Sequence, residues 1–121
     1  MMAANNMNDI ETIKDHYLRD TVSTRLGGLA ANLARIGSFA KNVANQNAVY
    51  ELLDESKWFI EWTAAETEID TAAQLVELQV ELSLWQLDWP AIWSNPAIRA
   101  AVATHSKSWS DRVLQLSGLL D

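Results

Sequence analysis

Apolar residues recur at helical spacing along most of the chain, and this periodicity constrains the fold more than any other feature. From Val22 onward the stripe alternates steps of four and three residues, the pattern of a helix that buries one face: Val22, Leu26, Leu29, Leu33, Ile36, Ala40 and Val43. No stretch of the sequence has the period-two alternation of a half-buried strand. The sequence therefore predicts an all-α protein.

Turn signals divide this pattern into four predicted helices that form an up-and-down bundle, near residues 9–44, 47–66, 70–88 and 96–119. Gly27 and Gly28 interrupt the first helix without changing the phase of its stripe, which favours a kink there over a break. Ser94 or Asn95 suits the N-cap of the last helix, and Pro96 suits its first position. Residues 1–8 are predicted to be disordered, and residues 9–121 to form a single helical-bundle domain.

The boundary between the second and third helices has two interpretations. The polar run at residues 66–70 favours a turn, which would bring Tyr50 opposite Trp85. Because this run contains neither Gly nor Pro, the alternative is one long helix over residues 47–88 and a bundle of three helices.

Charge and composition exclude several classes of function. The 121 residues carry a formal net charge of −7 and include no cysteine. Residues 46–93 hold one lysine against ten carboxylates. Since phosphate binding depends on Lys and Arg, we expect no DNA partner, and RNA is disfavoured. The chain start resembles no signal peptide and no apolar run reaches 18 residues, so we expect a cytoplasmic protein without a membrane partner.

Tryptophan is unusually frequent, with six residues in the chain. Five of them recur at i, i+4 spacing, namely Trp58/Trp62 and Trp85/Trp89/Trp93. We interpret most of these rings as core, each burying on the order of 150–250 Å². The first predicted helix is rich in small residues, which would leave space for an indole. Trp89 and Trp93 flank the break at Pro90 and are candidates for a partly exposed surface that binds a protein partner.

The length of the first predicted helix bears on assembly. At 1.5 Å per residue it would span roughly 52 Å, whereas a helix of 20 residues spans roughly 30 Å. The excess must either fold back at Gly27–Gly28 or bury its apolar stripe against another subunit. The second possibility predicts a homodimer, the commonest closed assembly.

The titratable residues predict neither a metal site nor a cofactor. His16 and His105 are the only histidines, and neither belongs to the Glu-x-x-His pairs of a di-iron bundle. His105 lies on the apolar stripe of the last helix, one turn before Trp109, which is typical of a hydrogen-bonded core histidine.

One short motif suggests chemistry. Arg99 and His105 stand six residues apart, and this Arg-x5-His pattern resembles the Arg-x(4–6)-His motif of HEPN-type ribonucleases. The resemblance implies that Arg99 stabilises phosphate charge and that His105 transfers a proton in RNA cleavage. On one continuous helix the two side chains would point roughly 120° apart, so they converge only through a bend or a second subunit.

These observations favour a non-enzymatic module for protein–protein interaction or oligomerisation. A HEPN-like ribonuclease or its inactive relative, using Arg99 and His105, is one alternative. A helical bundle that binds a small molecule in an indole-lined pocket is the other.

Overall fold

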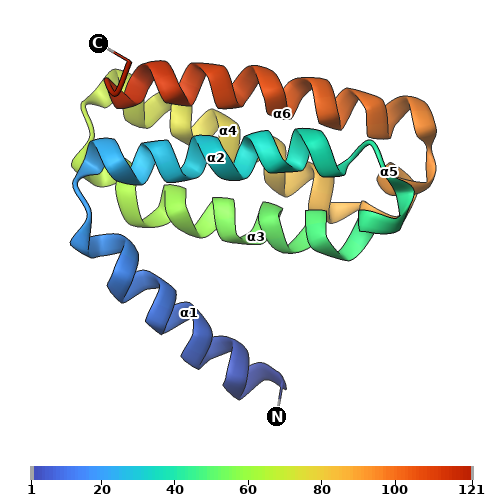
Figure 1. Ribbon diagram of the computed structural model, residues 1–121, viewed down its shortest axis with the longest axis horizontal. Helices are drawn as coiled ribbons and strands as arrows, with labels where there is room; N and C mark the ends of the chain where they lie inside the picture. Colours follow the sequence, from blue (N-terminus) through green and yellow to red (C-terminus); the bar gives the residue numbers. More distant parts are fainter. Residues whose placement is uncertain (1, 121) are drawn as a thin grey trace.

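The computed structural model describes residues 2–120, with side chains from residue 9 onward, and within these residues the protein is all helical (Figure 1). These residues form six α-helices, with a short 3₁₀ helix on either side of α3: α1 (Met2–Arg19), α2 (Val22–Phe39), η1 (Val43–Asn45), α3 (Gln46–Thr63), η2 (Ala64–Glu66), α4 (Ile69–Leu87), α5 (Trp89–Ser94) and α6 (Pro96–Ser117). The all-α prediction is confirmed. The predicted count of four is wrong, because the first predicted helix is divided in two and a short helix follows α4.

The division of the first predicted helix lies at Asp20 and Thr21. Thr21 has an extended backbone (φ −65°, ψ 160°), and its hydroxyl accepts a hydrogen bond from the amide of Thr24, which caps α2. The apolar stripe marks the same place, since Tyr17 and Val22 are five residues apart. α1 therefore leaves the other helices at an angle (Figure 1), and it begins at Met2, earlier than predicted. Only the backbone is described for residues 2–8, and residue 1 lies outside the described residues.

The two glycines do not redirect the chain, because α2 runs through Gly27 and Gly28 without interruption. The predicted kink at this position is replaced by the turn at residues 20–21. A Cβ atom on Gly27 would lie 2.8 Å from Leu119 Cδ1, and one on Gly28 would lie 3.8 Å from Tyr17 Cε1. Gly27 thus makes room for the end of the chain rather than for a bend.

A turn separates α3 from α4, so the alternative of one helix over residues 47–88 is wrong. The backbone of Thr67 is extended, and its hydroxyl donates to the carbonyl oxygen of Ala64 at 2.7 Å. The turn forms without Gly or Pro because the amide and the hydroxyl of Thr67 both donate to the Ala64 carbonyl at the start of η2. It brings Tyr50 next to Trp89, with ring centroids 5.9 Å apart, one helical turn from the Trp85 expected there.

The last helix begins as predicted. The Asn95 side chain accepts hydrogen bonds from the amides of Ala97 and Ile98, and Pro96 occupies the first turn, where its missing donor is not needed. Gly118 ends α6 in the left-handed region, with φ of 76°.

α2 and α6 pack side by side and antiparallel, and small residues set how closely they approach (Figure 1). A Cβ atom on Gly37 would lie 3.2 Å from the backbone oxygen of Ala103, and the Ser110 hydroxyl donates to the carbonyl oxygen of Ala30 at 2.7 Å. At these positions the space expected to hold an indole is filled by the backbone and a serine of α6.

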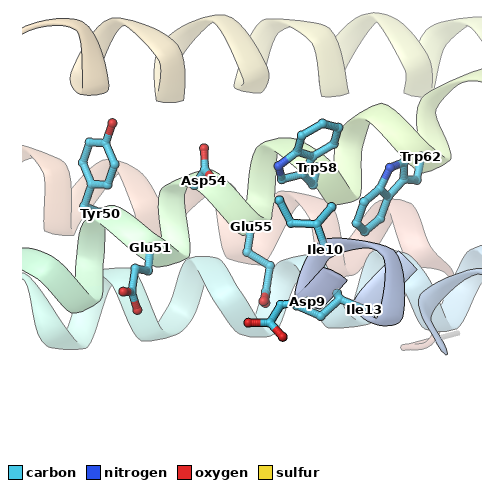
Figure 2. A pocket seen from close by; sticks show the side chains of 9 residues that line it. All are labelled: Asp9, Ile10, Ile13, Tyr50, Glu51, Asp54, Glu55, Trp58 and Trp62. Carbon is cyan, nitrogen blue, oxygen red and sulfur yellow. The ribbon is translucent and has the colours of Figure 1, made fainter. Parts of the chain in front are cut away.

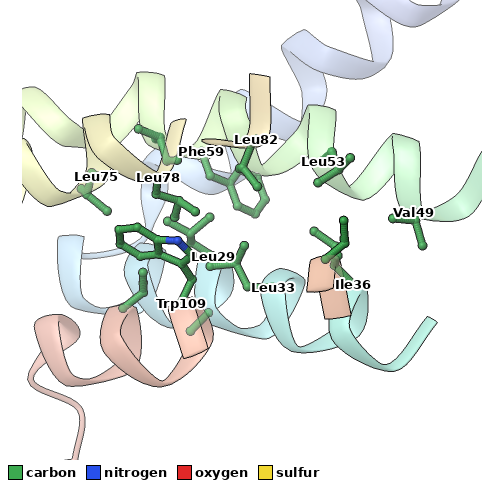
Figure 3. Close-up of a cluster of buried hydrophobic side chains, with 14 of the residues drawn as sticks. Leu29, Leu33, Ile36, Val49, Leu53, Phe59, Leu75, Leu78, Leu82 and Trp109 are labelled. Carbon is green, nitrogen blue, oxygen red and sulfur yellow. The ribbon is translucent and has the colours of Figure 1, made fainter. Parts of the chain in front are cut away.

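The large apolar side chains of the core gather between α2, α3, α4 and α6 (Figure 3). Fully buried side chains come from α2, α3, α4 and α6, among them Leu29, Leu33, Ile36, Leu53, Ile60, Leu75, Leu78, Leu82, Val102 and Val113. Within the described residues, no helix combines the length and apolar character required to cross a membrane.

Substitutions at two glycines of α2 should have opposite effects. Gly28→Ala should raise the free energy of unfolding by about 0.5–1 kcal/mol, because Ala is the better helix former and its Cβ fits at 3.8 Å. Gly37→Leu should lower it by about 1–3 kcal/mol, because the side chain forces α6 away. Urea denaturation of both variants checks this, and a destabilised Gly28→Ala protein would contradict the geometry of α2.

Candidate functional site

The outward side of α4 carries a row of exposed apolar residues, here called the α4 outer face: Ile69, Ala73, Val76, Val80, Leu84 and Leu87. The exposed fraction is 86% for Ile69, 60% for Leu84 and 83% for Leu87. The two valines are about half exposed. A row of this length, roughly 27 Å at 1.5 Å per residue, exceeds the single apolar residues normally scattered over a protein surface.

The opposite side of the same helix faces the core. Leu75, Leu78 and Leu82 have no exposed surface. α4 is therefore apolar on two opposite faces, which is typical of a helix buried on both sides. From the sequence, only the stripe that continues into Trp85 was recognised. The outer stripe was missed, although Val76 and Val80 lie in the same register as Ile69 and Leu87.

Glu81 fastens α4 to α6. One of its carboxylate oxygens lies 2.8 Å from His105 Nδ1, and the other accepts a hydrogen bond from Trp109 Nε1 at 3.2 Å. The side chain of His105 is 58% exposed. The interpretation of His105 as a core histidine is therefore wrong: the next residue, Ser106, faces the core, and His105 lies at the edge between α6 and α4.

Arg99 and His105 contact different parts of the molecule. The Arg99 guanidinium donates to the carbonyl oxygen of Trp93 at 2.7 Å and lies over the Trp93 ring, 5.5 Å from its centroid. His105 instead contacts Glu81 of α4. The structure does not bring the two side chains to one site within the chain. Arg99 instead connects α6 to α5 through its contacts with Trp93.

Trp89 and Trp93 lie in the core, with exposed fractions of 6% and 2%. Their rings contact each other at 5.2 Å, and the Trp93 indole donates to the carbonyl oxygen of Val43 at 2.8 Å. The core interpretation of both rings is confirmed. The expectation that they remain partly exposed for a partner is wrong, because α5 turns them inward beside Tyr50.

A polar cluster around Arg25 sets the position of α1. Arg25 is 7% exposed; its guanidinium lies 2.6 Å from the Glu66 carboxylate and donates to the carbonyl oxygens of Leu18 and Asp20. The Tyr17 hydroxyl donates to the Arg25 carbonyl at 2.8 Å. The positive charge lies at the C-terminus of α1, where it interacts favourably with the helix dipole.

The ring of Tyr17 completes this anchor. It stacks on Phe59 of α3, with centroids 4.0 Å apart, and its hydroxyl accepts a hydrogen bond from Thr63. Burial raises the pKa of Tyr17 to about 12, and the Thr63 hydrogen bond and the nearby Arg25 charge only partly offset this.

The described residues contain no group of three or more His, Asp or Glu side chains placed to hold a metal ion. Comparison of the chain with protein-family models, curated proteins and solved structures finds no match in any of the three. The function must therefore be inferred from the surfaces themselves.

The anchor at Tyr17 should make stability depend on alkaline pH. The phenol ionises near pH 10 in the unfolded chain and near 12 in the folded one, so its contribution is complete below pH 10 and is lost as pH rises toward 12. By pH 11 the loss should be about 1.4 kcal/mol.

The matched variant is Tyr17→Phe. At pH 8 it should be less stable than the wild type by about 1 kcal/mol, because the hydrogen bond to Arg25 is missing. By pH 11 the difference should have closed, since only the wild type loses stability through this phenol. Guanidinium denaturation at pH 8 and pH 11 measures this difference in the free energy of unfolding. A difference that does not change with pH would show that the Tyr17 phenol is not responsible.

Proposed function

We propose that this protein is a non-enzymatic oligomerisation module that forms a two-fold homodimer through the α4 outer face. The observation that carries the proposal is the exposed row of Ile69, Val76, Val80, Leu84 and Leu87 on a helix whose other side is already buried. Within the module we take α2, α3, α4 and α6 as the up-and-down bundle, with α1 and α5 as additions.

The spacing of the α4 outer face suits self-pairing. Four of its six positions are symmetric about residue 78: Ile69 and Leu87 lie nine residues to either side, and Val76 and Val80 lie two residues to either side. Two antiparallel copies of α4 that cross at the level of residue 78, on the side opposite Leu78, therefore place Ile69 opposite the second copy's Leu87. In a two-fold interface the same surface must complement itself, and this arrangement meets that condition.

Steric and electrostatic factors support the antiparallel arrangement. Ala73 is a small residue in the row, and Leu84 of the second copy can cover it. Antiparallel helices also align opposite dipoles. Glu77 is the one carboxylate close to its own copy across the axis, and an exposed like-charge contact of this kind costs only a few tenths of a kcal/mol.

The basis of the dimer differs from the one expected from the sequence. The chain breaks after Arg19, so the continuous first helix on which that expectation rested does not form. The unpartnered apolar surface lies on α4 instead. The acidity of residues 46–93 makes a basic helix of another protein the competing occupant of this face.

The oligomeric state tests the proposal directly. Size-exclusion chromatography with light scattering should show a dimer at micromolar concentration, and Val80→Asp should weaken it by at least about tenfold, because a carboxylate would be buried in the apolar seam. Val43→Asp is the matched control, since Val43 is similarly exposed, at 59% against 54%, but lies outside α4. A wild-type monomer would overturn the homodimer and favour the competing occupant.

Single cysteines test the direction of the two helices, because the chain has none of its own. Under mild oxidation, a mixture of Ile69→Cys and Leu87→Cys proteins should form a disulfide-linked heterodimer. Each variant alone should not, because an antiparallel pair holds two copies of residue 87 roughly 27 Å apart. Cross-linking of each variant with itself would instead indicate a parallel pair.

A further inference from the structure

A cleft of about 520 Å³ lies between α1 and α3, on a part of the surface that the proposed dimer does not use (Figure 2). α1 contributes Ile10 and Ile13, which form an apolar wall. The remaining lining side chains come from α3, apart from Asp9 of α1. The volume is within the range of roughly 300–1,000 Å³ that is usual for small-molecule sites.

Two indole rings of α3 lie opposite this wall, and Tyr50 lines the cleft farther along α3. Trp58 and Trp62 stack with centroids 5.6 Å apart and an interplanar angle of 25°, and Figure 2 shows Ile10 beside them. Trp58 and Tyr50 are each more than a third exposed. The faces of aromatic rings carry negative electrostatic potential, so they attract cations that approach them.

The polar groups of the cleft are all of one sign. Four carboxylates line it, from Asp9, Glu51, Asp54 and Glu55, with no Lys, Arg or His among the lining residues. Among the described residues none of the four forms an ion pair, and only Glu55 has a fixed partner, the Asn32 amide at 3.0 Å. Lys57, the one cation on α3, is directed away toward Gln86 of α4 at 2.7 Å.

We infer that this cleft binds a small organic cation of the alkylammonium class. The ammonium group lies against the Trp58 and Trp62 rings, the surrounding carboxylates supply the opposite charge, and the apolar body contacts Ile10 and Ile13. The three features favour the same ligand: an anion is repelled by the carboxylates, and a neutral apolar molecule leaves their charge uncompensated.

Isothermal titration calorimetry with choline and its neutral isostere 3,3-dimethylbutan-1-ol tests the inference. Choline should bind, the neutral alcohol should bind at least about tenfold more weakly, and added salt should weaken choline binding. Equal affinity for the two compounds, or no binding of choline, would overturn the inference.

Variants then locate the site. Trp58→Ala should weaken choline binding by about tenfold, and Glu51→Gln by a few-fold, because they remove an aromatic face and a charge respectively. Glu51→Gln is nearly isosteric at an exposed position, so it remains informative if Trp58→Ala fails to fold. Glu77→Gln on α4 is the matched control and should bind normally. Equal losses in Glu51→Gln and Glu77→Gln would show a general charge effect and refute the site.

Choline binding can be tested independently of the proposed dimer. Val80→Asp, designed to release monomers, should keep its affinity for choline, because α4 contributes no residue to the cleft. Loss of choline binding in this variant, while its fold is retained, would count against a site confined to α1 and α3.

Discussion

The close approach of α2 and α6 is the contact on which the rest of the fold depends. It is possible only because Gly37 faces the backbone of Ala103 and the Ser110 hydroxyl reaches the Ala30 carbonyl. Small residues therefore stand where the two helices approach most closely. In the core between α2, α3, α4 and α6, the fully buried side chains of α4 are all leucines, and Trp109 enters from α6 (Figure 3).

The sequence predicted the features that depend on local pattern. The all-α class, the turn near residue 67 and the start of α6 at Asn95–Pro96 follow from periodicity and capping, which act within a few residues. The break after Arg19 was also present in the sequence, as the five-residue step from Tyr17 to Val22. Gly27 and Gly28 favoured a kink at the wrong position, because a glycine can also allow close packing without bending a helix.

The sites were harder to predict because they depend on contacts between distant residues. The Trp93 indole is satisfied by a carbonyl fifty residues earlier in the chain, and this contact explains why it can be buried. His105 finds its partner on α4, which a helical stripe cannot reveal. The α4 outer face shows the same limit, because periodicity alone does not tell which of two apolar stripes faces the core.

Because of the turn at Asp20 and Thr21, α1 is attached to the other helices mainly at its C-terminal end. Arg25 and Tyr17 fix its C-terminal end to α2 and α3, whereas Asp9 lies roughly 16 Å farther along the helix axis. A rotation of about 10° at the turn therefore displaces Asp9 by about 3 Å, since displacement grows with distance from the pivot. The width of the space beside Trp58 is thus set by the angle at which one anchored helix leaves the turn, rather than by the packing of the core.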